Sequence, residues 1–372
     1  MKYFFSTGEA SGELSAVLLS RAIRGFDREA QFEGIGGERM RSEGFDLWRD
    51  HAGWASMGPL AAIPRIPKLY VTMRQTANHI VESKPDLVIA VDFGAFNMRL
   101  AKTLRTQLGY GAPMMDLFPP ATWLDKEGVA RAVSSWMVPV TAFVHQYDFY
   151  KRFGLPIVYF GHPLASQYVT RPSRPTPSAT GGTIALLPGS RGGELKFHVP
   201  ALLGAYRLLK ERRPELQARF GAASDDGEAI LHRELRRAKL DVPIVRGVAA
   251  AVDGADAAFV ASGTAVLETA LLGVPCVALY IIAKILVRHA RNVYPAGKFI
   301  TLPNLVLERN VVPELLQEAA TPERLADAME IVLRDPSVQY DAFLDLRERL
   351  GSPDALEDIG RFAVALAKAG RA

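Results

Sequence analysis

The sequence predicts a doubly wound α/β protein built from two domains. Apolar runs alternate with segments of helical pattern along the 372 residues, as in sheets whose strands are connected by helices. The apolar runs lack an alternation of inward and outward residues, so we expect parallel sheets covered by helices on both faces. A stretch rich in Pro, Ser, Thr and Gly at residues 171–182 interrupts this order, which then restarts.

In the first half of the chain, five apolar runs are expected to form strands. They are residues 2–7 (KYFFST), 31–37 (QFEGIGG), 86–94 (DLVIAVDFG), 113–118 (PMMDLF) and 142–146 (AFVHQ). A helical pattern follows the first run over residues 13–24, and another helix is expected to begin near Asn97.

In the second half, the expected strands are residues 183–189 (TIALLPG), 243–247 (PIVRG), 257–262 (AAFVAS) and 275–280 (PCVALY). Helices are expected over residues 199–211 and 265–272, and from residue 321 onward.

We therefore expect four parts in the chain. They are an N-terminal domain over residues 1–172, a linker over 173–182, a C-terminal domain over 183–345, and a terminal helix within 346–372 that can pack back on the N-terminal domain. Two doubly wound domains would place an interdomain cleft between the carboxyl ends of their strands, where such folds bind ligands.

Composition narrows the class of protein. Hydrophobic residues make up 49% and charged residues 23% of the chain, as in an ordinary globular protein. The net charge of +4 fits an anionic substrate or membrane surface but is too small to indicate nucleic acid. A single cysteine, Cys276, excludes a disulfide within the chain and favours a reducing compartment. Without a tight Cys/His cluster, we expect no metal site. We also expect no cofactor.

Two strand ends in the first half carry candidate site residues. The motif STGEASGE (residues 6–13) follows the first strand. Its helix amides could bind an anion or a hydroxyl, or it is an ordinary loop with Ser11 as the helix cap.

Asp92 ends the strand of the motif AVDFGAFN, and either caps the next helix or acts as a general base. In the second case, burial would raise its pKa from about 3.9 toward neutrality. Asn97 is similarly either a cap or a ligand contact.

Two motifs in the second half could bind a phosphate. Arg191 in LPGSRGGE (residues 187–194) could bind a phosphate or form a structural pair with Glu194. In ASGTAVLE (residues 261–268), Thr264 opens a helix whose amides could bind phosphate. Glu268 lies one turn later, and either binds a ligand diol such as a ribose or has a structural partner.

These motifs together resemble those of lipid-A-disaccharide synthases over nearly the whole chain. In chain order the matching motifs are GEASGE, GIGGERM, Met57 with Gly58, VDFGAFN, GHPLA, LLPGSRGGE, ASGTAVLE and ITLPNL. The resemblance implies a two-domain glycosyltransferase fold of the GT-B type. It also implies an inverting, metal-independent enzyme on the cytoplasmic face of the inner membrane. Such an enzyme joins UDP-2,3-diacylglucosamine to 2,3-diacylglucosamine 1-phosphate (lipid X).

The resemblance also assigns roles to residues. It implies that Asp92 and Glu9 are catalytic. Glu13, in the same first loop, takes the place of a more usual aspartate. The residues implied to bind substrate are Ser11, Asn97, Gly189, Ser190, Arg191, Ser262, Gly263, Thr264, Glu268 and Asn304.

The chain departs from the family pattern at three places near the acceptor and acyl side. After ALY, Ile281 and Ile282 stand where a basic residue is usual. Ala95 stands where a second aspartate is usual. In the segment LFPPATWLDKEG, Pro120 and Trp123 match a Ser-Pro-Ser-x-Trp-Ala-Trp type stretch, but Asp125 replaces its second tryptophan. These changes concern the acceptor more than the nucleotide.

Two stretches that mix bulky apolar and basic residues could contact a membrane, or could be helices packed on a core. Their basic residues include Arg65, Lys68, Lys284, Arg288 and Arg291. Three alternative functions also remain: a GT-B enzyme with another acceptor, a UDP-sugar 2-epimerase, and a non-catalytic relative that binds lipid or UDP-sugar. The sequence leaves the oligomeric state open.

Overall fold

The computed structural model describes residues 1–51, 66–120, 126–170, 172, 182–283 and 299–370. They form two compact units. Unit 1 holds the described residues up to Gln167 and from Leu350 onward, and unit 2 holds those from Tyr168 to Arg349. Of the expected linker, only residue 182 is among the described residues.

Unit 1 is built on a parallel sheet in the order β3-β2-β1-β4-β5-β6-β7. Its strands are β1 (Lys2–Ser6), β2 (Gln31–Gly36), β3 (Asp46–Asp50), β4 (Leu87–Val91), β5 (Met114–Leu117), β6 (Val138–Thr141) and β7 (Val158–Tyr159). The order runs outward in both directions from β1 and β4, so the carboxyl ends of these two strands form the switch point of the sheet.

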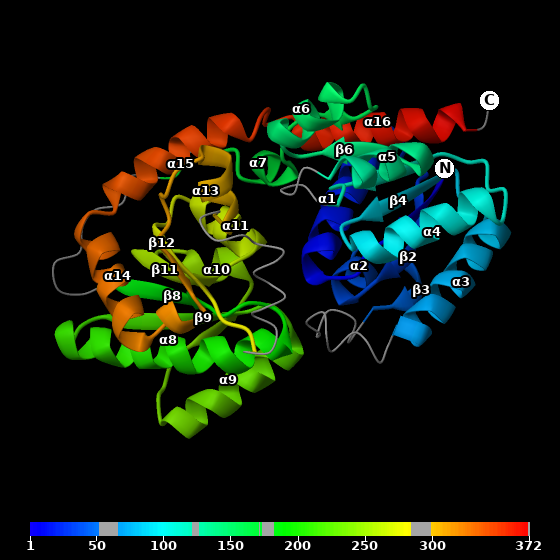
Figure 1. Ribbon diagram of the computed structural model, residues 1–372. Coiled ribbons are helices and arrows are strands. Elements are labelled where there is room, and N and C mark those ends of the chain that lie inside the picture. Colours follow the sequence, from blue (N-terminus) through cyan, green and yellow to red (C-terminus); the bar gives the residue numbers. More distant parts are fainter. Residues whose placement is uncertain (52–65, 121–125, 171, 173–181, 284–298, 371–372) are drawn as a thin grey trace. The chain divides into compact units, whose positions relative to one another are not determined.

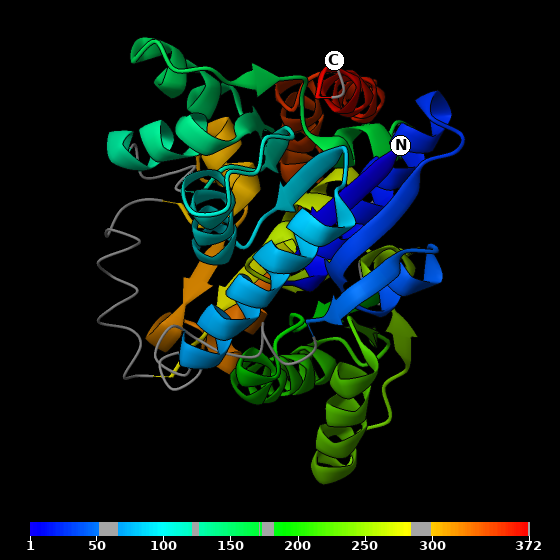
Figure 2. The same cartoon turned by 90° about the vertical axis from the view of Figure 1, so that its right-hand side faces the viewer.

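Helices cover both faces of this sheet. One face packs on α1 (Ala10–Phe26), α2 (Glu38–Ser42) and α16 (Ala355–Ala369). The other packs on α3 (Ile66–Ser83), α4 (Gly94–Thr106) and α5 (Glu127–Trp136). Figures 1 and 2 show α3 and α4 side by side on this second face. Two further helices, α6 (Val144–Arg152) and α7 (Pro163–Gln167), follow β6 and β7.

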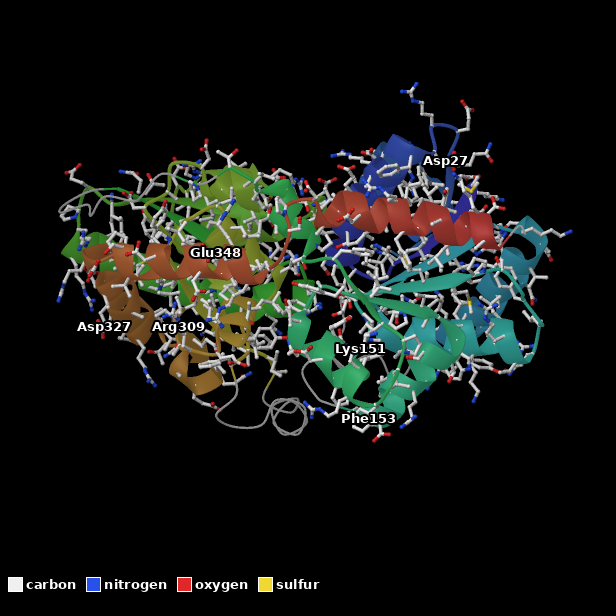
Figure 3. All side chains as sticks on the ribbon, turned by 90° about the horizontal axis from the view of Figure 1, so that it is seen from above. Asp27, Lys151, Phe153, Arg309, Asp327 and Glu348 are labelled. Atoms are coloured by element: carbon white, nitrogen blue, oxygen red, sulfur yellow. The ribbon has the colours of Figure 1, made fainter. Side chains whose placement is uncertain are left out.

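The last helix, α16, returns to unit 1 and packs along α1 (Figure 1). A Cβ at Gly360 of α16 would lie 2.8 Å from the Cβ of Ala22 in α1, so the two helices need glycine there. At the end of α1, Asp27, labelled in Figure 3, accepts a hydrogen bond from the amino group of Met1 at 2.9 Å. These contacts fix α1 between one face of the sheet and the terminal helix.

Unit 2 repeats the plan with the strand order β10-β9-β8-β11-β12-β13, again parallel. The strands are β8 (Thr183–Leu187), β9 (Gln217–Ala222), β10 (Ile244–Arg246), β11 (Ala257–Ala261), β12 (Cys276–Tyr280) and β13 (Glu314–Leu316). Its switch point lies at the carboxyl ends of β8 and β11. The two sheets confirm the predicted doubly wound α/β class.

The helices of unit 2 also lie on both faces. Those that pack on the main core are α8 (Gly192–Arg212), α9 (Asp225–Ala238) and α14 (Pro322–Arg334). The remaining helices are α10 (Val248–Val252), α11 (Thr264–Leu271), α13 (Leu302–Leu307), the 3₁₀ turn η2 (Gln317–Ala319) and α15 (Ser337–Arg349). Thr321 caps α14 by accepting a hydrogen bond from the N–H of Arg324 at 3.3 Å.

One expected strand was wrong. Residues 142–146 do not form a strand, because β6 lies just before them and α6 begins at Val144. The sequence disfavoured β6 because Pro139 cannot donate a ladder hydrogen bond. Strand β7 pairs only with Val140 and Thr141 of β6. Pro139 therefore lies outside the ladder between β6 and β7, where its missing N–H is tolerated.

Candidate active site

The first loop and the turn after β4 meet at the switch point of unit 1. Asp92 and Phe93 both have left-handed backbone conformations, with φ of 51° and 58°. Such angles strain residues other than glycine, and strained backbone concentrates at functional sites. A Cβ at Gly8 would lie 2.3 Å from the Phe93 ring, so glycine lets the loop accept this turn.

The carboxylate of Asp92 is exposed, not buried. Oδ1 accepts a hydrogen bond from the N–H of Phe93 at 2.9 Å, and the Ser11 hydroxyl lies 3.5 Å from Oδ2. The hypothesis that burial tunes this acid was therefore wrong, because the left-handed turn directs it away from the apolar strand. Ala95, one of the departures from the family pattern, is exposed nearby.

Asn97 holds this turn from behind. It is 1% exposed, and its amide nitrogen donates to the backbone oxygens of Asp92 at 2.6 Å and Ser6 at 3.3 Å. Its oxygen accepts from the Ser6 hydroxyl at 2.6 Å. Asn97 is therefore neither a helix cap nor a surface that a ligand reaches directly; it joins the ends of β1 and β4.

The start of α1 also differs from the expectation. Glu9, half-buried, occupies the N-cap position, so Ser11 lies inside the helix and is not its cap. Glu13 is 6% exposed and contacts His51 at 2.5 Å, while its other oxygen accepts from the N–H of Arg39 at 3.2 Å. His51 was missed because it follows β3 in an isolated position that no motif marks.

Asp116 of β5 is a second residue that sequence reasoning missed. It is 2% exposed, and its Oδ2 has no hydrogen-bond partner among the described residues. Burial, reinforced by the charge of Asp92, raises the pKa of Asp116 to about 8. The available signal was an acid inside the apolar run PMMDLF.

His162 lies beyond β7, in the GHPLA motif. Its Nδ1 accepts a hydrogen bond from the N–H of Leu164 at 3.1 Å, and the rings of Phe118 and Phe143 lie 5.9 and 5.4 Å away. Burial lowers the pKa of His162 to about 3, so this imidazole is neutral near pH 7.

In unit 2, Arg191 occupies the N-cap position of α8, just beyond the carboxyl end of β8. Its side chain is 36% exposed, and Nη1 contacts Glu194 Oε1 at 2.8 Å. The same oxygen accepts from the Tyr280 hydroxyl at 3.2 Å. The structural pair that the sequence left open is therefore present. Gly189 takes a φ of 101° in the turn, and Ser190 is exposed beside it.

His198 ties this turn to the neighbouring strand end. The ring is fully buried, with Nδ1 2.7 Å from the oxygen of Pro188 and Nε2 2.9 Å from the nitrogen of Ile281. An acceptor at one end and a donor at the other require a neutral ring with its proton on Nδ1. Burial lowers the pKa of His198, which favours that form.

The motif at α11 presents its residues at the end of β11. Gly263 occupies the N-cap position, and the Ser262 hydroxyl donates to the backbone oxygen of Ile300 at 3.3 Å. Thr264 is the first residue of the helix. One turn later, Glu268 accepts a hydrogen bond from the Tyr168 hydroxyl at 2.5 Å, so it has the structural partner that the sequence left open.

Asn304 lies within α13 and is hydrogen-bonded on all sides. It is fully buried, and its oxygen accepts from the N–H groups of Val311 and Val312, both at 2.8 Å. Its nitrogen donates to Glu314 Oε1 at 2.9 Å, which also accepts from the Thr301 hydroxyl at 2.7 Å. Instead of the direct substrate contact expected from the motif ITLPNL, the described contacts of Asn304 fix the loop between α13 and β13.

Comparison with known proteins decides the family. A family model described as lipid-A-disaccharide synthetase matches residues 3–351. The lipid-A-disaccharide synthase of Syntrophus aciditrophicus is 33% identical over 376 residues, which cover 97% of this chain and 96% of that protein. That of Myxococcus xanthus is 34% identical over 379 residues, covering 98% and 97%. The chain belongs to the lipid-A-disaccharide synthase family. It is therefore a glycosyltransferase.

Solved structures of low sequence identity share the fold of this synthase family member. The UDP-GlcNAc 2-epimerase of Neisseria meningitidis, solved with UDP-GlcNAc bound, gives a TM-score of 0.62 at 11% identity, covering 98% of this chain and 100% of that chain. Spinosyn rhamnosyltransferase SpnG, complexed with thymidine diphosphate, gives 0.56 at 12% identity, covering 95% and 98%. At such identities the likeness shows the GT-B-type fold alone.

The expected membrane contacts of this family member fall mostly outside the described residues. Arg65, Lys284, Arg288, Arg291 and the altered segment 121–125 all lie there. Lys68 is exposed in the first turn of α3, near Tyr70, which is 51% exposed. Among the described residues, no helix combines the length and apolar character needed to cross a bilayer.

Proposed function

We propose that this chain transfers 2,3-diacylglucosamine from UDP to the 6-hydroxyl of 2,3-diacylglucosamine 1-phosphate. The acceptor oxygen forms a bond to C1 of the donor sugar, the bond from C1 to the diphosphate breaks with inversion, and UDP leaves. The acceptor proton passes to a carboxylate. The similarity to named lipid-A-disaccharide synthases over 97–98% of this chain carries the proposal.

Unit 2 supplies the donor side of this proposal. The half-exposed guanidinium of Arg191 has five N–H donors, so it can bridge Glu194 and a diphosphate oxygen. Ser190, Gly263 and Thr264 would add hydroxyl and amide donors at helix starts, where anions are stabilised. These groups can stabilise the departing diphosphate without a metal.

Glu268 now accepts a hydrogen bond from the Tyr168 hydroxyl. When the donor binds, Glu268 would accept hydrogen bonds from the ribose hydroxyls instead. Asn304 and His198 would support the donor site indirectly, by holding the loops around it. Asn304 would hold the loop after α13, and His198 would hold the loop before α8, since both side chains are fully buried and hydrogen-bonded to those loops.

Unit 1 supplies the acceptor side. Asp92 is the proposed general base because its carboxylate is exposed on a turn fixed from behind by Asn97. Ser11, beside Asp92, and Glu9, at the start of α1, would orient the acceptor sugar.

The lipid substrates imply that the enzyme works at a membrane surface, on the cytoplasmic face of the inner membrane. Basic and bulky apolar side chains in one exposed stretch suit an anionic bilayer. Lys68 and Tyr70 at the start of α3 provide such a stretch.

The test is to present both acylated sugars in anionic vesicles and to follow product by mass spectrometry. We expect the disaccharide monophosphate and equimolar UDP, with the enzyme sedimenting with the vesicles. Donor turnover without acceptor would indicate an epimerase instead. UDP binding with no turnover on any acylated glucosamine would leave a non-catalytic relative.

A further inference from the structure

A second carboxyl group lies beside Asp92 on the neighbouring strand. In the pairing of β4 with β5, Ala90 is opposite Asp116 and Val91 is opposite Leu117. The N–H of Asp92 then donates to the backbone oxygen of Leu117 at 3.2 Å, which continues the ladder. Asp92 and Asp116 are therefore fixed at the same end of two hydrogen-bonded strands.

The two carboxyl groups have opposite surroundings. Asp92 is exposed, whereas Asp116 is 2% exposed within a strand whose other residues are all buried. Across the sheet, Asp116 is opposite Pro139, which has no N–H to donate. Its Oδ2 has no hydrogen-bond partner among the described residues.

Among the described residues, the only charged group that shifts the pKa of Asp116 is Asp92, which cannot neutralise a negative charge on it. Asp92 carries a negative charge, and the phenol of Tyr150, on α6, is itself buried with no hydrogen-bond partner among the described residues. A buried, unpaired carboxylate costs several kcal/mol, and a like charge nearby adds to that cost. Asp116 therefore keeps its proton at neutral pH, consistent with its pKa of about 8.

We propose that Asp116 is a positioning residue for Asp92. When Asp116 is protonated, Asp92 has no second negative charge beside it on the neighbouring strand. When Asp116 ionises, its negative charge repels the phosphorylated acceptor. This inference rests on the function proposed above. It gives the buried acid a purpose that packing does not, because its Oδ2 makes no hydrogen bond to the described part of the fold.

The kinetic test compares wild type with Asp116→Asn, which stays uncharged at every pH. The measurement is kcat/KM for the acceptor between pH 6 and 10. In wild type we expect kcat/KM to fall as Asp116 ionises near pH 8, through a higher acceptor KM. In Asp116→Asn this alkaline fall should be lost, and Asp116→Ser should behave likewise.

Tyr150→Phe is the matched control, because it removes the neighbouring buried hydroxyl without adding or removing a charge. It should keep the alkaline fall. An Asp116→Asn enzyme with the wild-type pH profile would overturn the proposal, as would a wild type with no alkaline fall. A uniform loss of activity at every pH would also overturn it, since a merely structural role predicts that result.

A second measurement reports on the proton without using activity. The pKa of Asp116 is higher in the folded state than the unfolded value of about 3.9, so its contribution to stability falls as pH rises from about 4 to about 8. Denaturant unfolding at several pH values should show this loss in wild type and not in Asp116→Asn. Parallel pH profiles would refute the protonated state, and a wild type that makes no disaccharide would refute the proposed function instead.

Discussion

The charged residues proposed for the donor side and the acceptor side, Arg191 and Asp92, are held in place in different ways. Arg191 is kept in place by an ion pair with Glu194, whose carboxylate is also bonded by Tyr280. Asp92 is kept by its backbone, which Asn97 fixes in a left-handed turn. An arginine that binds phosphate can remain paired with a carboxylate such as Glu194. A general base such as Asp92 must instead remain accessible to the acceptor hydroxyl.

Replacing Arg191 with Gln should weaken UDP binding by about 1.5–3 kcal/mol, or roughly ten- to hundred-fold, because a charged hydrogen bond is lost. Titration calorimetry with UDP measures this. Arg212→Gln is the matched control, since Arg212 lies at the other end of α8 and contacts Asp327 at the same 2.8 Å. Equal affinities for the two variants would remove Arg191 from the donor site.

For single residues, the sequence predicted which acids and bases lie at strand ends, but not which of them are buried. It identified Asp92 as a strand-end acid, yet the buried acid with the raised pKa is Asp116. The left-handed angles of Asp92 and Phe93 separate the two cases, and no pattern of residue types specifies them. Asn304 shows the same limit, because a motif does not reveal which way a side chain points.

Among the elements, the contact between α1 and α16 joins the two ends of the chain in unit 1. The close approach depends on Gly360, since a Cβ there would meet both the side chain and the backbone of Ala22 at 2.8–2.9 Å. Helix α1 also carries Glu9, Ser11 and Glu13 at its other end. Its position therefore affects the proposed acceptor side.

Gly360→Ala should destabilise unit 1 by about 1–3 kcal/mol, because backbone atoms cannot move aside as a flexible side chain could. Gly25→Ala is the control: Gly25 is exposed in α1 and a Cβ there meets nothing within 4 Å. That change should be neutral or stabilise by up to about 1 kcal/mol. Denaturant unfolding compares them, and equal effects would show that the helix contact is loose.

Most elements of the two sheets follow from the apolar runs, because buried parallel strands need little else. The exceptions were residues 142–146 and the strands β3, β6, β7, β9 and β13, which no expected run covered. Several of these are short or at sheet edges, where half-buried residues do not form an apolar run. Whether such a segment forms a strand depends on its pairing with the neighbouring strand of the sheet.

The whole molecule contains two doubly wound units, each with candidate chemistry at the switch point of its own sheet. Unit 1 presents an exposed carboxylate, and unit 2 presents a half-exposed arginine among helix starts. The motifs predicted this division of labour because they fall in separate halves of the chain. It implies that binding of the donor and transfer to the acceptor can be lost separately.

The most direct test of that division is acceptor-dependent UDP release by Asp92→Asn, with UDP affinity measured on the same preparation. An amide cannot accept the acceptor proton as a carboxylate does, so turnover should fall by roughly 10²–10⁴-fold, as is typical when general base catalysis is lost. UDP affinity should equal that of wild type. An Asp92→Asn enzyme that keeps wild-type turnover would contradict the account.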